Sequence, residues 1–220
     1  MKTALVFGSS GLVGGYLLNQ LIENDNYNKI KIFVRSEPEN NDPKVEIIKT
    51  DFNNLENHKE DIKGNDCFFC IGTTKQNSPD QSEYRRVELD VPKKIAQIAK
   101  SNSVNSFVFV SSGYADPKSS GDYLKFKGEV EEELKRLNFP KLGIMRPSFL
   151  LGDRKEKRVG EKIGIFVFKL LSPLFLGPLK KMKPIHSETV AKAMISSANE
   201  NLKKNVFESN EIAELVLNQT

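Results

Sequence analysis

Residues 4–14 of the chain read ALVFGSSGLVG, and no other short stretch says as much about the fold. An apolar run, Ala4–Phe7, is followed directly by three glycines with GxxGxxG spacing and then by a helical pattern. Such glycines permit a tight turn and let the backbone approach a pyrophosphate, whose charge the N-terminus of a helix favours. We therefore predict a dinucleotide cradle made by Gly8, Ser9, Ser10, Gly11, Leu12, Val13 and Gly14.

Apolar runs and helical patterns alternate along the chain. The expected strands are Thr3–Phe7, Ile30–Val34, Val45–Ile48, Cys67–Ile71, Phe107–Val110 and Leu142–Met145. The expected helices are Leu12–Asn24, Asn54–Ile62, Ser82–Lys100, Asp122–Leu137 and Ser187–Asn199. This alternation predicts an α/β fold, a doubly wound parallel sheet of the Rossmann type with right-handed crossovers. We expect a single domain over residues 1–220, with a nucleotide-binding core at 1–150 and a small substrate-covering segment at 151–220.

The charge of the chain is nearly balanced, with 33 basic and 29 acidic residues and a formal net charge of +4. The two signs are interspersed, so the sequence shows no basic stripe or patch of the kind that binds nucleic acid. No apolar run reaches the roughly 20 residues of a membrane-spanning helix. The first apolar run ends at a glycine-rich turn, which is unlike a signal peptide. We therefore expect a cytoplasmic protein that does not bind nucleic acid.

The cysteines and histidines do not predict a metal site. Cys67 and Cys70 lie in an expected buried strand, where positions three apart point to opposite faces. Their CxxC spacing therefore does not indicate a metal or redox pair. The two histidines, His58 and His186, also lack metal-ligand spacing.

Residues that follow the other expected strands indicate which cofactor the cradle holds. An acidic residue after the second strand would bind the adenosine ribose 2′-hydroxyl, but this chain has Arg35, which can pair with a 2′-phosphate. We therefore predict a preference for NADP(H) over NAD(H). Asp51-Phe52 follows the third strand, where the carboxylate can accept a hydrogen bond from the adenine amino group. Gly72, Thr73 and Thr74 follow the fourth strand and complete the predicted cofactor contacts.

A tyrosine and a lysine suggest acid–base chemistry. Tyr123 and Lys127 are four residues apart in a helical pattern and therefore share a face. An ammonium beside a tyrosine favours the phenolate, so the phenol can give a proton to a carbonyl oxygen or take one from an alcohol. Ser111 and Ser112 end the fifth strand segment, and either hydroxyl would bind the substrate oxygen. A surface tyrosine at a chance YxxxK spacing is the alternative.

The pattern changes beyond Arg146. Residues 153–158 form a run of charges, which predicts a solvated loop or a segment that faces the substrate. The mostly apolar residues 163–179 follow and are interrupted by Lys169 and Pro173. We expect a core helix or an apolar lid over the pocket. Contact with a membrane surface and a homodimer face are the alternatives.

These motifs together resemble a known family. The glycine loop, Asp51, Tyr123 and Lys127 are similar to the short-chain dehydrogenase/reductase superfamily, in its extended or atypical branch. Three further motifs resemble the Tat-interacting-protein-like oxidoreductases of that branch, over nearly the whole chain. They are CIGTT at 70–74, YLKFKGE at 123–129, and Arg146-Pro147 followed by Arg154 and Gly160-Glu161.

The resemblance implies an NADP(H) site with Pro147 and Ser148 near the nicotinamide end, and a catalytic set of Ser112, Tyr123 and Lys127. The chain departs from the superfamily in one helix. Many members carry an asparagine before the fifth strand that helps to relay protons, whereas residues 87–90 offer acids here. The gap between serine and tyrosine is also short, and Gly113 is placed where some relatives have the serine.

We therefore predict an NADPH-dependent carbonyl reductase or alcohol dehydrogenase that acts on a small, rather apolar substrate. Two alternatives come from other classes. One is an NADP(H)-binding regulatory or interaction protein with little turnover, which would meet a partner through residues 163–179. The other is an isomerase or epimerase that regenerates its cofactor in each cycle. The residues leave open the substrate, the direction of the reaction, the serine that serves and the oligomeric state.

Overall fold

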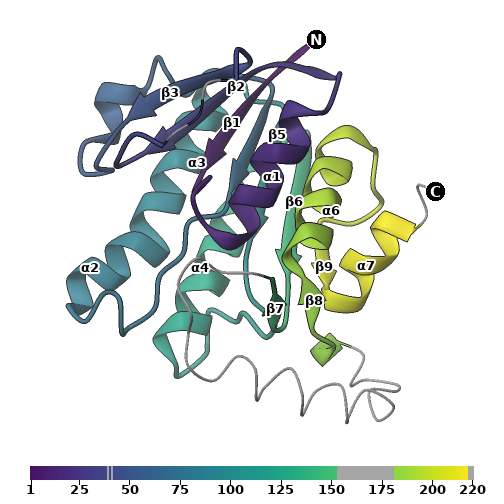
Figure 1. Cartoon of the computed structure of the whole chain (residues 1–220). Helices are drawn as coiled ribbons and strands as arrows, with labels where there is room; N and C mark the ends of the chain where they lie inside the picture. The colour runs from purple at the N-terminus through teal and green to yellow at the C-terminus, as the bar shows by residue number, and fades with distance from the viewer. Residues whose placement is uncertain (39, 41, 153–180, 218–220) are drawn as a thin grey trace.

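The computed structural model describes residues 1–38, 40, 42–152 and 181–217. Within them a seven-stranded parallel sheet lies between two layers of helices (Figure 1). The strands are β1 (Lys2–Phe7), β2 (Tyr27–Val34), β3 (Val45–Lys49), β4 (Asp66–Phe69), β5 (Ser106–Val110), β6 (Lys141–Arg146) and β9 (Val206–Glu208). Their order across the sheet is β3-β2-β1-β4-β5-β6-β9. The predicted doubly wound α/β fold is confirmed.

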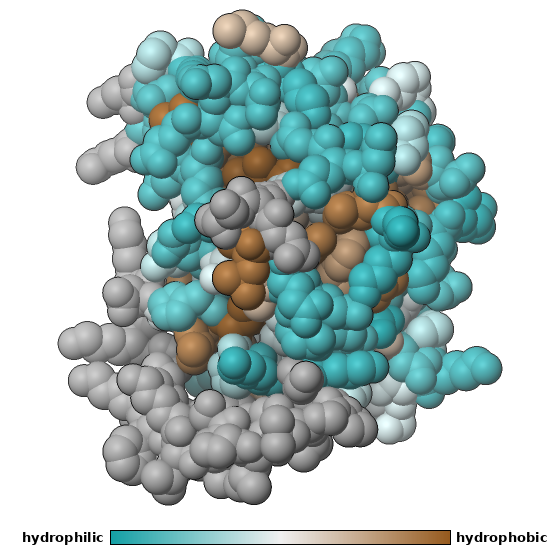
Figure 2. Space-filling view, turned by 90° about the vertical axis from the view of Figure 1, so that its right-hand side faces the viewer, coloured by the Kyte–Doolittle hydropathy of each residue, from teal (hydrophilic) through white to brown (hydrophobic). Residues whose placement is uncertain are grey.

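The helices cover both faces of this sheet (Figure 1). On one face lie α3 (Val91–Ser101) and α4 (Asp122–Leu137), and on the other lie α1 (Leu12–Ile22) and α6 (Ser187–Asn199). The short α2 (Gln81–Arg85) leads through a π-helical turn into α3, and α7 (Ser209–Leu217) packs against α6. On the side of the molecule that carries α6 and α7, hydrophobic patches lie among mostly hydrophilic surface (Figure 2).

Side chains of the central strands alternate between two apolar cores. In β1, Leu5 and Phe7 belong to the core under α3 and α4, while Ala4 and Val6 belong to the core under α1 and α6, and all four are fully buried. A strand buried on both faces explains why the sequence shows continuous apolar runs rather than alternation. Phe7 and Phe33 stack with ring centroids 4.3 Å apart and join β1 to β2.

The strand order reverses between β1 and β4, which are neighbours in the sheet. The glycine loop follows β1 at this point, beside the chain that leaves β4. Open α/β sheets bind their ligands in the crevice at such a switch point, outside the carboxyl ends of the strands. The topology therefore brings the predicted cofactor loop, the residues after β4 and the serines after β5 to one edge.

Most expected elements are confirmed, two of them to the residue, α4 and α6. The expected helix at 82–100 is present as α2, the π-helical turn and α3. The expected helix Asn54–Ile62 is wrong, because only a 3-10 turn at Leu55–His58 forms there. The segments at 153–158 and 163–179 lie outside the described residues.

The C-terminal residues contribute more to the sheet than the sequence predicted. The strand β9 and the helix α7 were not expected, nor was a small parallel pair of β7 (Leu150–Leu151) and β8 (Ile185–His186). The three residues of β9 are too few to show the two-residue period of a strand in the sequence. In the structure they pair with β6 in register. The division of the chain at residue 150 stays a prediction.

The two cysteines behave as the strand pattern predicted. Cys67 packs in the core under α3 and α4, and Cys70 packs against the opposite core, with its sulfur 3.9 Å from that of Met194. Both are free thiols. Among the described residues, no cluster of three histidine, cysteine or acidic side chains is arranged to hold a metal, and no helix there has the length and apolarity needed to span a bilayer.

Candidate active site

The loop after β1 excludes side chains at two of its three glycines. Gly8 has a φ of +91°, and a Cβ there would lie 2.9 Å from the carbonyl carbon of Cys70. A Cβ on Gly14 would overlap the Gly8 carbonyl oxygen, so α1 packs directly on the turn. Gly11 is the exposed N-cap of α1, and its N–H donates to the Gly8 oxygen at 3.0 Å. This shape fits a pyrophosphate beside the first turn of α1, whose amides lack helical partners.

A cleft of about 980 Å³ lies along the carboxyl edge of the sheet. Most of the predicted site residues line it. They are Ser10, Gly11, Leu12, Val13, Gly72, Thr73, Thr74, Ser111, Ser112, Tyr123, Lys127 and Pro147. Segments that are far apart in the sequence therefore meet around one space, as the strand ends predicted.

The remaining predicted residues lie elsewhere. Gly8, Ser9 and Gly14 form the turn itself and are largely covered by it. Arg35 is exposed after β2, outside the lining of the cleft. Asp51 is also exposed, and hydrogen bonds from the backbone and side chain of Asn53 hold the pKa of its carboxyl below the ordinary value.

Phe52 follows Asp51 with a left-handed φ of +63°. Its ring lies 6.5 Å from the ring of Phe7, centroid to centroid, so it covers the end of the core beside β1. The cofactor roles of Arg35, Asp51 and Phe52 stay predictions.

Tyr123 and Lys127 lie on one face of α4, with the lysine Nζ 5.9 Å from the centroid of the tyrosine ring. The tyrosine is 39% exposed, whereas the lysine is buried. The lysine Nζ donates to the Val110 carbonyl oxygen at 3.5 Å and lies 4.9 Å from the centre of the Phe109 ring. The end of β5 therefore holds a buried ammonium beside a tyrosine that reaches the cleft.

A buried carboxylate balances this ammonium. Glu88 is fully buried, and its Oε2 lies 3.0 Å from Lys127 Nζ. Its Oε1 accepts a hydrogen bond from the Thr73 backbone N–H. Burial lowers the pKa of Lys127, but the charges of Glu88 and Tyr123 more than offset this, so the pKa lies above its ordinary value. Lys127 is therefore an ammonium at neutral pH.

The sequence pattern had shown acids at 87–90 but had assigned them no role. The signal that could have found Glu88 is its spacing, because it follows the buried Tyr84 by four residues on the apolar face of the helix. An acid on that face must find a partner in the core.

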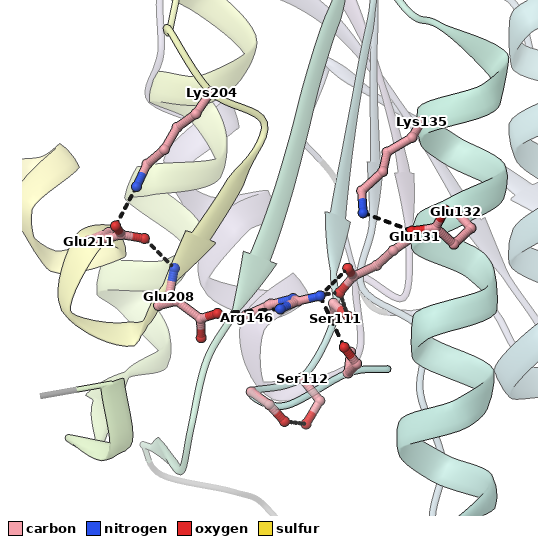
Figure 3. A network of polar contacts seen from close by, with 11 residues as sticks. Ser111, Ser112, Glu131, Glu132, Lys135, Arg146, Lys204, Glu208 and Glu211 are labelled. Carbon is pink, nitrogen blue, oxygen red and sulfur yellow. Dashed lines mark hydrogen bonds and ion pairs between the residues drawn. The ribbon is translucent and has the colours of Figure 1, made fainter. Parts of the chain in front are cut away.

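The two candidate serines have different surroundings (Figure 3). Ser111 is buried and donates to Glu131 Oε1 at 2.5 Å. Ser112 is half-buried, lines the cleft, and makes a long contact of 3.3 Å to the Gly113 carbonyl oxygen. Ser112 is thus the serine that is better placed to bind a ligand, and this agrees with the family resemblance.

Glu131 belongs to a charged run on α4 whose composition predicts a solvated helix face, and for Glu131 this prediction is wrong. Glu131 is 1% exposed, and the guanidinium of Arg146 binds it through Nη2 at 2.6 Å and Nε at 2.9 Å. Arg146 also reaches Glu208 at 3.3 Å and the Ala115 carbonyl oxygen at 3.0 Å (Figure 3). The partner, Arg146, lies on β6, so the sequence of α4 alone does not indicate that Glu131 is buried and paired.

Comparison with known sequences decides the family. A sequence profile of the family described as NAD(P)H-binding matches residues 8–201. The chain belongs to this NAD(P)H-binding family. The NAD(P)H-binding protein is 34% identical to Protein HTATIP2 of Rattus norvegicus over 166 residues, which cover 73% of this chain and 67% of that protein. It is 30% identical to Protein FMP52-1, mitochondrial, of Scheffersomyces stipitis over 228 residues, with 97% and 98% covered.

Solved structures confirm the fold. A UDP-N-acetylglucosamine 4-epimerase from Methanobrevibacter ruminantium M1, in complex with UDP-N-acetylmuramic acid, gives a TM-score of 0.71 at 19% identity and covers 94% of this chain and 75% of its own. The Bordetella bronchiseptica enzyme WbmH, in complex with NAD+, gives the same TM-score at 15% identity and the same coverage. At these identities the likeness is one of fold, and it agrees with the predicted Rossmann-type sheet.

The expectation of a cytoplasmic location is contradicted by these relatives. FMP52 proteins that match nearly the whole chain, such as those of Scheffersomyces stipitis and Eremothecium gossypii, are named mitochondrial. The sequence features used for that expectation therefore do not indicate the compartment.

Proposed function

We propose that this NAD(P)H-binding protein is an NADP(H)-dependent oxidoreductase for small, rather apolar carbonyl or alcohol substrates. The observation that carries the proposal is the Tyr123–Lys127 pair, which lies at the edge of the cleft that the glycine loop also borders. A proton donor and a dinucleotide cradle on one cleft are the two parts that hydride transfer to a carbonyl needs.

The residues that would hold the cofactor follow from the fit of the cleft. The glycine loop at 8–14 would hold the pyrophosphate, because bulkier side chains at Gly8 and Gly14 would close the turn. The loop at 72–74 and Pro147 would border the nicotinamide half, and Asp51 would lie at the adenine. When bound, the cofactor supplies or takes up a hydride.

The chain itself moves the proton. In the reduction direction Tyr123 gives its proton to the substrate oxygen, and Lys127 stabilises the phenolate that remains. Ser112 donates a hydrogen bond to the same oxygen and so orients the substrate. In the reverse direction the phenolate takes the proton from an alcohol. The ammonium remains protonated throughout because Glu88 stays beside it.

The test of this function is NADPH oxidation with a panel of small aldehydes and ketones, comparing the wild type with Tyr123→Phe. The variant keeps the ring and loses only the hydroxyl, so NADPH should still bind. We expect turnover to fall by about 10²- to 10⁴-fold, the usual contribution of a general acid. Undiminished turnover in Tyr123→Phe would remove the tyrosine from the mechanism.

We further propose that the protein prefers NADPH over NADH. It is supported by Arg35, an exposed cation after β2 where an acid would otherwise repel a 2′-phosphate. Arg35→Ala should weaken NADPH binding by about 10-fold or more, equal to about 1.4 kcal/mol, and leave NADH binding unchanged. The matched control is Lys29→Ala, which removes an exposed cation near the other end of β2. Equal losses for both nucleotides would contradict the assignment.

A further inference from the structure

Glu88 is an acid in a place where the fold offers apolar neighbours. It is fully buried, and Tyr84, Leu89 and Val91 near it in the same helical run are buried as well. A carboxylate without partners in such a place would strongly destabilise the folded state. The buried charge of Glu88 is therefore stabilised by the two groups that it contacts, the Lys127 ammonium and the Thr73 backbone N–H, and both residues line the cleft.

We propose that Glu88 is a positioning residue of the reaction centre, which holds the Lys127 ammonium and the Thr73 backbone N–H with one carboxylate. The proposal rests on the proposed function, since it assigns a role within the same site. One oxygen lies 3.0 Å from Lys127 Nζ, and the other accepts from Thr73. The acid–base pair on α4 and the loop after β4 are therefore fixed relative to each other by a third element.

The loop after β4 is shaped around this carboxylate. A Cβ on Gly72 would lie 3.5 Å from Glu88 Oε1 and 3.9 Å from Lys127 Nζ, so the backbone passes close to both charges. Thr73 is also tied to Ser78 by a hydroxyl contact of 3.0 Å. A displacement of Glu88 would therefore move the wall of the cleft as well as the lysine.

The helix departs from α-helical geometry at Glu88. Residues 86–90 form a π-helical turn, in which the Val91 N–H donates to the Arg86 carbonyl oxygen five residues earlier. Pro92 follows and has no N–H to give to the carbonyl oxygen of Glu88, so a regular α-helical bond is absent there. Such π turns often occur at functional sites. Here the turn carries the acid that contacts the cleft residues.

The charge of Glu88 has a consequence for Lys127. The titratable groups that face the lysine are Glu88 from the π turn, Tyr123 from α4 and Cys70 from the end of β4. Burial raises the pKa of the Cys70 thiol to about 12, so this group is neutral over the working range. Without the Glu88 carboxylate, burial would therefore favour loss of the proton from Lys127.

The experiment uses Glu88→Gln, which keeps the size of the side chain and an oxygen for the Thr73 N–H but removes the charge. We expect kcat for NADPH-dependent carbonyl reduction to fall by about 10- to 100-fold, as for a displaced acid–base pair. In ¹⁵N-labelled protein, the Lys127 Nζ titration should move to lower pH by about one unit or more. The alkaline limb of the pH–rate profile should move in the same direction.

Two further variants separate this role from simple stability. Glu88→Asp keeps the charge on a shorter side chain, so it should restore the Lys127 titration toward the wild type while kcat stays reduced. Glu133→Gln removes a mostly buried α4 carboxylate that pairs with Arg136 away from the cleft. It should change neither the lysine titration nor kcat.

A wild-type kcat and an unmoved Lys127 titration in Glu88→Gln would overturn the proposal. A reduced kcat with an unmoved titration would also overturn it, because the loss would then be structural. If the wild type itself transfers no hydride to any carbonyl, the proposed function fails instead. In that case the Lys127 titration in Glu88→Gln still decides whether Glu88 holds the ammonium.

Discussion

Two buried ion pairs lie one turn apart on α4, and they are built with opposite polarity. In the first, α4 supplies the cation, and Lys127 lies 3.0 Å from Glu88. In the second, α4 supplies the anion, and Glu131 lies 2.6 Å from Arg146. The first pair borders the cleft beside Tyr123, whereas the second is enclosed by Ser111, Ala115 and Glu208 (Figure 3).

The two ion pairs differ in the number and geometry of the bonds that their cations make. Arg146 bonds through Nε, Nη1 and Nη2, and these bonds join β6 to α4, to β9 and to the loop after β5. A planar guanidinium with several fixed partners acts as a clamp. The ammonium of Lys127 is a compact charge beside an exposed tyrosine, so its field can act on the phenol. One helix thus carries the proposed acid–base pair and, one turn later, the ion pair that joins the helix to β6.

The largest expected effect comes from opening the clamp. Arg146→Met should lower the free energy of unfolding by about 3–5 kcal/mol, because Glu131 is left buried without a cation. Urea denaturation measures this. The matched control is Lys135→Met, which removes the partner of the exposed Glu132 on the same helix and should cost less than about 1 kcal/mol. Equal losses in the two variants would show that the clamp is no stronger than a surface pair.

The second prediction concerns Tyr84, which lies near the Lys127–Glu88 pair and should make the free energy of unfolding depend on pH in the alkaline range. Burial raises the pKa of Tyr84 to about 12, with a further contribution from Glu88. The native state therefore keeps this proton above the ordinary tyrosine pKa, near pH 10, at which the unfolded chain loses it. The stability linked to Tyr84 is present below about pH 10 and is lost as the pH rises to about 12, by about 2 kcal/mol.

The check is urea denaturation of the wild type and of Tyr84→Phe at intervals from pH 8 to pH 12. Because the variant has no phenol at this position, its stability should fall less over the upper part of this range. Parallel curves for the two proteins would mean that Tyr84 does not carry the linkage.

The smallest effect should separate the two serines. Ser111→Ala removes a hydrogen bond to a buried carboxylate, so we expect a loss of about 1–2 kcal/mol in the free energy of unfolding. Ser112→Ala should leave stability nearly unchanged and lower carbonyl turnover instead. The measurements are denaturant unfolding and NADPH oxidation on both variants. The reverse pattern, with turnover lost in Ser111→Ala alone, would mean that Ser111 and not Ser112 binds the substrate oxygen.

The sequence predicted the parts of the site that follow from local spacing. The residues of the glycine loop lie within a few positions of one another in the chain, and so do Tyr123 and Lys127. The strand ends then placed both groups at one edge of the sheet. The helix Asp122–Leu137 was predicted to the residue, because apolar residues recur along it with helical spacing and charged residues fill the rest.

The pairs that depend on distant partners could not be predicted. Glu131 looks like its exposed neighbours until Arg146 on another strand reaches it. In the sequence Glu88 is one acid among several. Only its ion pair with Lys127, 39 residues later, distinguishes it from the others. The strand β9 was missed because three residues show no period, and its place in the sheet is set by pairing with β6.

The proposed function requires that the glycine loop bind a nicotinamide dinucleotide, and fluorescence titration with NADPH tests this. The wild type is compared with Gly11→Asp, which adds a charge where the pyrophosphate would lie but also supplies a favourable helix cap, so the fold should be kept. Gly121→Asp makes the same change at the exposed N-cap of α4, outside the cleft lining. The account predicts binding in the micromolar range for the wild type and Gly121→Asp, and at least about 100-fold weaker binding for Gly11→Asp. Equal binding by all three proteins, or none by the wild type, would contradict it.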